Sequence, residues 1–307
     1  ILADQLGRSV GDMYAGAIYP ALILTSMYVG YVFIRATFSP ERAPALPPEA
    51  RTLRGWKLFT RVIFVLIPPL ALIFLVLGTI FLGIATPTEG GAMGATGALA
   101  LALINRRLSW SLLRQAMNST AKLTSFVIFI LVGATVFSLT FRGVNGDIWV
   151  EHLLTGIPGG VIGFLILVNV LVFLLAFFLD FFELAFIVVP LLAPVAEKMG
   201  IDLIWFGVLL GVNMQTSYMH PPFGFALFYL RSVAPFKEYT DKISGRRIAP
   251  VTTGQIYWGA VPFVVIQCIM VGILIAFPGL VTSNLEKSTV DPSKVIIDIQ
   301  PTDGGSK

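Results

Sequence analysis

Residues 213–224 read NMQTSYMHPPFG, a polar stretch that interrupts an otherwise apolar run from residue 203 to residue 230. The flanks, residues 205–212 and 225–230, are predicted to be the two halves of one membrane-crossing helix. Pro221 and Pro222 have no amide N–H, and a proline disfavours helical backbone at the residue before it. Within a membrane, non-helical backbone survives only where it is buried in protein or lines a cavity. The break therefore predicts a broken helix beside a cavity.

The residues of this break are the first candidates for a binding site. Carbonyl groups freed by the prolines, with the hydroxyls of nearby residues, are typical of sites for a small cation or an anionic solute in transporters. The candidates are Gln215, Thr216, Ser217, His220, Pro221, Pro222 and Gly224. His220 is a candidate for coupling to protons, because histidine as a residue type titrates near neutral pH. A lone histidine beside two prolines is more often a hydrogen-bonded structural residue, so coupling to protons is the weaker hypothesis.

The composition predicts a polytopic membrane protein. Of the 307 residues, 56% are hydrophobic and only 12% are charged, whereas soluble proteins are about a quarter charged. The single cysteine, Cys268, excludes a disulfide within the chain, and with two histidines we expect no resident metal site or other cofactor. We expect no nucleic-acid binding, because the basic residues lie between apolar segments. No nucleophile, histidine and acid pattern and no phosphate loop stands out, so we expect no enzyme.

The basic residues predict a topology for the apolar segments. Those segments are residues 14–34, 58–85, 90–104, 121–141, 159–179, 184–195, 203–230 and 254–277. Of the 21 Lys and Arg residues, the loops 35–61, 106–122 and 231–247 hold 6, 4 and 5. The positive-inside rule places these three loops in the cytoplasm and the loops 142–158 and 197–202 outside.

This topology predicts a re-entrant hairpin over residues 159–196, because both of its ends are external. Its second arm, residues 184–195, is about 18 Å long at 1.5 Å per residue, which is too short to span a bilayer. A second full span with an unusual end is the alternative. The tip and the break are then expected to face each other near the middle of the membrane, as in secondary transporters.

Asp180 and Glu183 lie at the expected tip, deep in apolar sequence, where charges are costly and rare. Two interpretations stay open, and they are compatible. The carboxylates coordinate an ion, or they cap the returning helix, with Asp180 at the N-cap and Glu183 three residues later completing a capping box.

A second helix start is predicted at Thr86-Pro87-Thr88-Glu89, with Thr86 at the N-cap, Pro87 at the first helical position and Glu89 completing the box. We expect the helix that follows to pack closely on a neighbour through its small residues, Gly90, Gly91, Gly94 and Gly97. A structural role for the element is favoured over a part in shaping a cavity. Asn169, midway along an apolar helix, is expected to form an inter-helix hydrogen bond.

Three ordered motifs resemble a known family, the large membrane subunit of TRAP transporters (tripartite ATP-independent periplasmic transporters). The first is GIATPTEGGA at residues 83–92. The second comprises FLD at 178–180, IVVP at 187–190 and GID at 200–202, and it is similar to that family's second hairpin and the loop after it. The third, QTS at 215–217 with PPFGFALF at 221–228, is similar to its broken helix.

The resemblance implies a sodium-coupled importer of a carboxylate-bearing solute, an organic acid, in a bacterial or archaeal inner membrane. It implies an elevator-type, all-α fold, with Na⁺ as coupling ion near Asp180, Thr216 and Ser217. The implied partners are a small membrane subunit, an extracytoplasmic solute-binding protein and the surrounding membrane lipid. A channel-like or scaffold membrane protein without a coupled substrate is the second hypothesis.

Two departures from the family pattern affect these expectations. His220 stands where the pattern has threonine, which removes a hydroxyl at that position. The first half of the family architecture is also absent, so we expect the chain to need a missing N-terminal half of the large subunit. Residues 1–57 are then a first transmembrane helix and a cytoplasmic loop, residues 58–277 the second-repeat membrane region, and residues 278–307 a polar tail.

Overall fold

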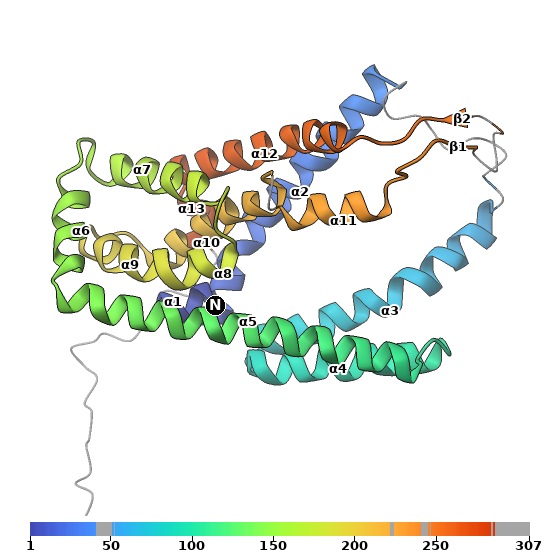
Figure 1. The fold of residues 1–307 in the computed structure, drawn as a ribbon, viewed down its shortest axis with the longest axis horizontal. Helices are drawn as coiled ribbons and strands as arrows, with labels where there is room; N and C mark the ends of the chain where they lie inside the picture. Colours follow the sequence, from blue (N-terminus) through green and yellow to red (C-terminus); the bar gives the residue numbers. More distant parts are fainter. Residues whose placement is uncertain are drawn as a thin grey trace, which may run out of the picture.

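The computed structural model describes residues 1–40, 51, 53–221, 224–240, 245, 247–283 and 285. Pro222 and the greater part of the expected polar tail, residues 286–307, lie outside the described residues. Within that part of the chain the protein is all-α apart from one short antiparallel pair, β1 (Tyr239–Thr240) with β2 (Arg247–Ile248). This confirms the predicted fold class of an all-α polytopic protein, and Figure 1 shows its elongated shape.

The central helix is α10 (Leu203–Met214), which contacts helices from both ends of the chain. It begins at Leu203, where the apolar run of the sequence begins, and the Asp202 carboxylate caps it by accepting hydrogen bonds from the amides of Ile204 (2.9 Å) and Trp205 (2.8 Å). Phe206 and the neighbouring leucines of α10 are fully buried. The helices around it are α1 (Leu2–Gln5), α2 (Val10–Phe38), α7 (Gly160–Leu175), α9 (Val189–Lys198), α12 (Thr253–Ala276) and α13 (Gly279–Thr282).

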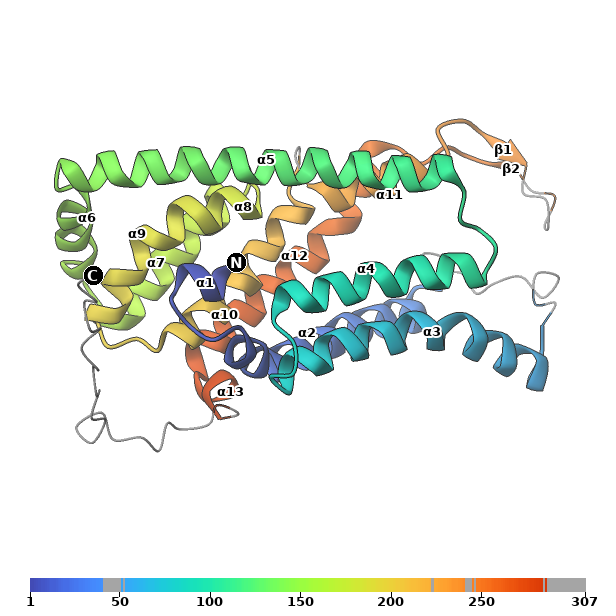
Figure 2. The ribbon, with the colours of Figure 1, turned by 90° about the horizontal axis from the view of Figure 1, so that it is seen from below.

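Three further helices lie outside this core. They are α3 (Gly55–Phe81), α4 (Pro87–Ile104) and α5 (Trp110–Gly143). Figure 2 shows α5 running along one long edge of the molecule, with α3 and α4 packed together on the other side. Among the described residues, four helices are long and apolar enough to cross a membrane, namely α2, α3, α5 and α12, and there are five if the bent pair of α6 (Gly146–Thr155) and α7 is one span.

The α3–α4 contact depends on three of the four glycines predicted for it. A Cβ built on Gly90 would lie 2.9 Å from Ile80 Cδ1, and one on Gly97 would lie 2.3 Å from Leu72 Cδ1. Gly94 is also in contact distance of α3, but a Cβ on Gly91 would meet nothing within 4 Å. The expectation for Gly91 was therefore wrong, because this residue is exposed and faces away from α3, about 100° around the helix from Gly90.

Residues 160–198 form a helical hairpin. After α7 the chain turns at residues 176–180 and returns through α8 (Phe181–Glu183), a π-helical segment (Leu184–Val188) and α9. The return arm thus runs from Phe181 to Lys198 and is longer than the predicted residues 184–195. The π segment ends just before Pro190, which cannot donate the hydrogen bond that a regular α-helix needs there.

Both ends of the hairpin lie beside one short helix. α6 contacts α7 and α9, and the Lys198 ammonium group donates to the Glu151 carboxylate of α6. The segment around α6 was expected to be a loop, and it is instead a helix bent by 119° from α7. Entry of this hairpin into a membrane and its return to the same side stay a prediction.

Candidate functional site

The break separates α10 from α11 (Phe225–Val233). After Met214 the chain tightens into a 3₁₀ segment (Gln215–Met219), and His220 then has extended backbone with φ −79° and ψ 125°. Pro221 has no N–H, so the Tyr218 carbonyl, three residues before it, has no amide partner there, whereas the Ser217 carbonyl still accepts a hydrogen bond from the His220 amide at 3.4 Å. Irregular backbone with a freed carbonyl therefore lies where the sequence predicted it.

Thr216 and Ser217 are buried and turned toward their own helix. The Thr216 hydroxyl donates to the Asn213 carbonyl and the Ser217 hydroxyl to the Met214 carbonyl, each at 2.7 Å. Gln215 is exposed. The hydroxyl groups thus satisfy carbonyls at the end of α10.

His220 packs between two phenylalanines of the hairpin. Its ring stacks on Phe177 with centroids 3.9 Å apart and meets Phe173 edge-on at 4.7 Å. The residue is 2% exposed, and neither ring nitrogen forms a hydrogen bond of normal geometry with the described residues. The carbonyl of Ala176 lies near enough to interact with the ring. The surroundings are aromatic, in contrast to the hydrogen-bonded role expected for a lone histidine.

Gly224 allows the chain to cross closely over the break. Its amide donates to the His220 carbonyl at 2.7 Å. A Cβ at this position would lie 2.6 Å from the Tyr218 carbonyl oxygen and 2.9 Å from that of His220. Such contacts are too short, so the structure assigns Gly224 a backbone role in the break.

The hairpin tip carries the predicted capping box. One Asp180 oxygen, Oδ1, accepts hydrogen bonds from the amides of Phe182 (2.9 Å) and Glu183 (3.0 Å). The Glu183 carboxylate accepts one from the Asp180 amide at 3.1 Å. The capping interpretation is confirmed, and Asp180 Oδ2 is left without a hydrogen bond from the described residues.

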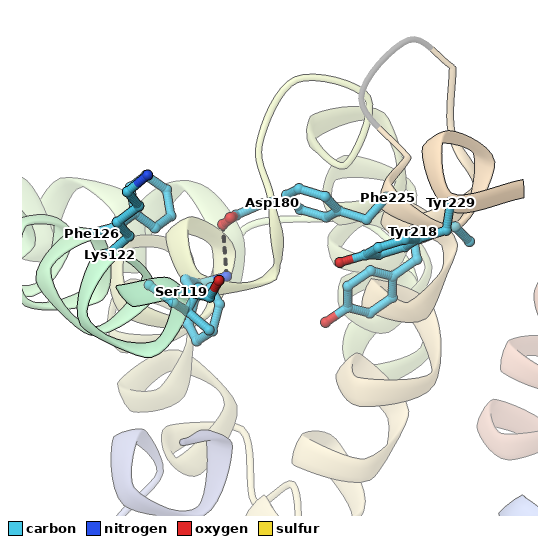
Figure 3. Close-up of a pocket in the computed structure, with 10 residues that line it drawn as sticks. Ser119, Lys122, Phe126, Asp180, Tyr218, Phe225 and Tyr229 are labelled. Carbon is cyan, nitrogen blue, oxygen red and sulfur yellow. Dashed lines mark hydrogen bonds between the residues drawn. The ribbon is translucent and has the colours of Figure 1, made fainter. Parts of the chain in front are cut away.

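The tip and the break line one cavity of about 790 Å³, shown in Figure 3. Ser119, Lys122 and Phe126 enter it from α5 on one side, and Tyr218, Phe225 and Tyr229 from the break and α11 on the other. Asp180 lies between them, with its carboxylate directed toward the α5 side and its bond to the Phe182 amide drawn as a dashed line. The break and the hairpin tip, which are distant in sequence, thus meet around one space.

Not every predicted site residue reaches this cavity. Asp180 lines it, but Glu183, Thr216 and Ser217 are not among its lining residues. His220 and Pro221 line a separate apolar cavity of about 300 Å³ beside α12, with Tyr257 and Trp258. Within the described part of the chain, no three His, Cys, Asp or Glu side chains gather at one point.

The main residues that sequence reasoning missed are Ser119, Lys122 and Tyr218. Lys122 was counted in the cytoplasmic loop 106–122, but α5 already begins at Trp110, capped by the Ser109 hydroxyl. The signal was present in the spacing, because residues 119, 122 and 126 fall on one face of a helix. The residues on the other side of the cavity come from distant parts of the chain, so the sequence alone does not show that this helical face forms a site.

Two other predicted elements have structural roles. The Asn213 amide donates to the Asn169 backbone carbonyl (2.7 Å) and side-chain oxygen (2.9 Å), which confirms the inter-helix hydrogen bond between α7 and α10. The Thr86–Glu89 capping box is also confirmed, with the Thr86 amide donating to Glu89 at 2.7 Å. None of Thr86, Pro87, Thr88 and Glu89 lines the cavity at the hairpin tip.

Comparison with known proteins gives matches over most of the chain. The family described as "Tripartite ATP-independent periplasmic transporter, DctM component" matches residues 1–280. The "C4-dicarboxylate TRAP transporter large permease protein DctM" of Rhodobacter capsulatus is 29% identical over 224 residues, which are 72% of this chain and 49% of that protein.

Two other relatives have different solutes in their names. The "Ectoine/5-hydroxyectoine TRAP transporter large permease protein UehC" of Ruegeria pomeroyi is 27% identical over 77% of this chain and 54% of that protein. The "Sialic acid TRAP transporter permease protein SiaT" of Haemophilus influenzae is 22% identical over 90% of this chain and 41% of that protein. The chain spans about half the length of the curated relatives it matches.

Proposed function

We propose, from the premise that this chain belongs to the DctM component family of tripartite ATP-independent periplasmic transporters, that it forms part of a secondary transporter for a carboxylate-bearing solute. The chain is a multi-pass protein of the inner membrane, in keeping with its family and its long apolar helices. The relatives are named as permeases, which favours transport over catalysis.

One observation carries this proposal. A helical hairpin and a broken helix present their irregular segments, at Asp180 and Tyr218, to the same cavity. Broken elements with free backbone groups are the usual way in which transporters bind solutes and ions inside a membrane. A scaffold protein has no need of such a cavity.

We extend the proposal to sodium as the coupling ion. The oxygen atoms that favour this are Asp180 Oδ2, which has no hydrogen bond from the described residues, and the Tyr218 carbonyl, which precedes Pro221 by three residues. The Thr216 and Ser217 hydroxyls donate within their own helix and do not line the cavity, so this extension rests on Asp180 and the Tyr218 carbonyl. The proposed partners are a small membrane subunit, an extracytoplasmic solute-binding protein and the remaining part of the large subunit.

Uptake into vesicles tests the proposal. The complete permease that contains this chain is reconstituted with its small subunit, and its binding protein is added outside with radiolabelled succinate, sialic acid or ectoine. We expect at least one of these carboxylates to accumulate under an inward sodium gradient and none to accumulate when choline replaces sodium. Sodium-independent equilibration would support a channel, and no uptake of any probe would support a scaffold.

A further inference from the structure

We propose that Lys122 of α5 holds the anionic group of the solute and so determines which solutes the cavity at the hairpin tip accepts. This inference rests on the transport function proposed above and assigns a residue to it. Lys122 lines the cavity together with Ser119 and Phe126, at the spacing of one helical face. The same face lies across the cavity from Tyr218, Phe225 and Tyr229 (Figure 3).

The Lys122 ammonium group is free to bind an anion. It makes no ion pair and no hydrogen bond with any described residue, although Asp180 lines the same cavity. By contrast, Arg8 pairs with Glu197 at 3.3 Å, and Lys198 pairs with Glu151. An ammonium group has three N–H donors and no acceptor, so an unpaired one in a cavity suits a carboxylate ligand.

Anchoring at the membrane surface explains Lys122 less well. Anchor residues gather at the ends of spanning helices. Lys122 lies twelve residues after Trp110, the first residue of α5, which is about 18 Å along the helix at 1.5 Å per residue. Arg114 and Lys122 are both exposed, but Arg114 lies in the second turn of the helix and is not among the cavity residues. Arg114 therefore fits the anchoring role, and Lys122 fits the cavity.

The rest of the lining defines the remainder of the solute. The wall opposite Lys122 is aromatic. Its tyrosines, Tyr218 and Tyr229, contribute phenol hydroxyls and backbone groups as polar atoms. Rings of this kind pack on the apolar body of a solute while a few polar groups fix its orientation. The cavity therefore suits a small solute with an anionic group at α5 and a carbon skeleton that packs on the aromatic wall toward α11.

Transport kinetics test the role of Lys122. The probe is whichever of succinate, sialic acid and ectoine the complete transporter accumulates, and the matched control is Arg114→Gln. We expect Lys122→Gln to raise the KM for that probe at least tenfold at equal protein level, and Lys122→Arg to stay within threefold of the parent. Arg114→Gln should leave KM unchanged. An unchanged KM for Lys122→Gln, or an equal loss of maximal rate in the Gln and Arg variants, would overturn the proposal.

Chemical labelling gives a second test, in which the labelling rate is a readout that does not need transport. In a permease whose native cysteines, Cys268 included, are replaced by alanine, Lys122→Cys is treated with a positively or a negatively charged methanethiosulfonate reagent. We expect the positive reagent to restore uptake and the negative one to abolish it. We also expect the probe to slow the labelling. Labelling at a rate that the probe does not change would show that the solute does not contact this position, even if the transporter itself is active.

Discussion

At the scale of single residues, the two oxygen atoms of the Asp180 carboxylate meet different requirements. Oδ1 caps the returning arm of the hairpin through two amide bonds, whereas Oδ2 has no hydrogen bond from the described residues. The capping task needs an oxygen acceptor but no charge, since Asn and Asp are about equal as N-caps. Ion binding needs the charge. Two substitutions therefore separate the roles.

We expect Asp180→Asn to fold as the parent does and to raise the sodium concentration for half-maximal uptake several-fold. Asp180→Ala should also lose about 0.5–2 kcal/mol of stability, because the cap is removed. Uptake as a function of sodium concentration and thermal unfolding of the purified permease measure the two effects. If Asp180→Asn keeps the parent's sodium dependence, the carboxylate is a cap alone.

Gly224 is limited by space at the break. A methyl group there would come within 2.6 Å of the Tyr218 oxygen and 2.9 Å of the His220 oxygen, both of which belong to the backbone. Because backbone atoms cannot move aside as a flexible side chain does, we expect Gly224→Ala to destabilise the protein by about 1–3 kcal/mol and to impair uptake.

Gly272 of α12 is the matched control for this change, because a Cβ there would meet nothing within 4 Å. Gly272→Ala should be neutral or stabilising by up to about 1 kcal/mol, as alanine favours helix more than glycine does. Thermal unfolding of both variants decides the matter. Equal unfolding temperatures for the two would show that the close approach at Gly224 is relaxed in solution.

At the scale of elements, two buried asparagines join the hairpin to the broken helix. Asn213 of α10 donates to both oxygen atoms of Asn169 in α7, and the Asn169 amide donates to the Leu165 carbonyl of its own helix. These bonds place the arm of the hairpin against the half of the broken helix that leads into the cavity. They therefore fix the relative position of Asp180 and Tyr218.

A double-mutant cycle of Asn169→Ala and Asn213→Ala measures this contact. Hydrogen bonds between membrane helices average about 0.6 kcal/mol, so we expect a coupling energy of about 0.5–1.5 kcal/mol, because two bonds are lost. Unfolding of the purified protein in mixed micelles gives the four free energies. Asn105→Ala serves as control, since among the described residues the side chain of this C-cap residue bonds only to the Leu101 carbonyl of the adjoining α4. Strictly additive free energies would contradict the contact.

The features that could be predicted from the sequence are those that depend on the chemistry of neighbouring residues. The caps at Thr86 and Asp180 follow from residues three positions apart, and the break at His220 follows from prolines that lack an N–H. The inter-helix bond of Asn169 also followed, because a buried amide in an apolar helix needs a partner. Each of these depends on groups close in sequence or on one unsatisfied side chain.

The cavity itself depended on contacts between distant elements. Lys122 lies on α5, and its neighbours come from residues almost 60 and 100 positions later. Lys122 was assigned to a loop because the first residues of α5, 109–114, are partly polar and basic. Ser109 is in fact the N-cap of this helix. The same limit affected Thr216 and Ser217, whose spacing gave no indication that their hydroxyls bond to their own helix.

At the scale of the whole molecule, the two ends of the long axis differ in charge and construction. One end holds α6 with both ends of the hairpin and the ion pairs Arg8–Glu197 and Lys198–Glu151. The other holds the β1–β2 pair and the beginning of α5 (Figures 1 and 2). The positive-inside rule predicts that the β1–β2 end is cytoplasmic and the α6 end external.

Single-cysteine labelling tests this orientation. Cys268 is first replaced by alanine, and cysteine is then introduced by Val144→Cys or Met199→Cys at the α6 end, or by Glu238→Cys beside β1. Val144 and Glu238 are exposed and lie outside the helices, so a small thiol should not disturb the fold. We expect a membrane-impermeant maleimide to label the first two variants from outside intact cells, and the third only after the cells are opened.

The hairpin must return to its starting side if Val144→Cys and Met199→Cys behave alike. Labelling of Met199→Cys and Glu238→Cys from one face would instead mean that residues 160–198 cross the membrane once, and the cavity would then lie at a different depth from the one proposed.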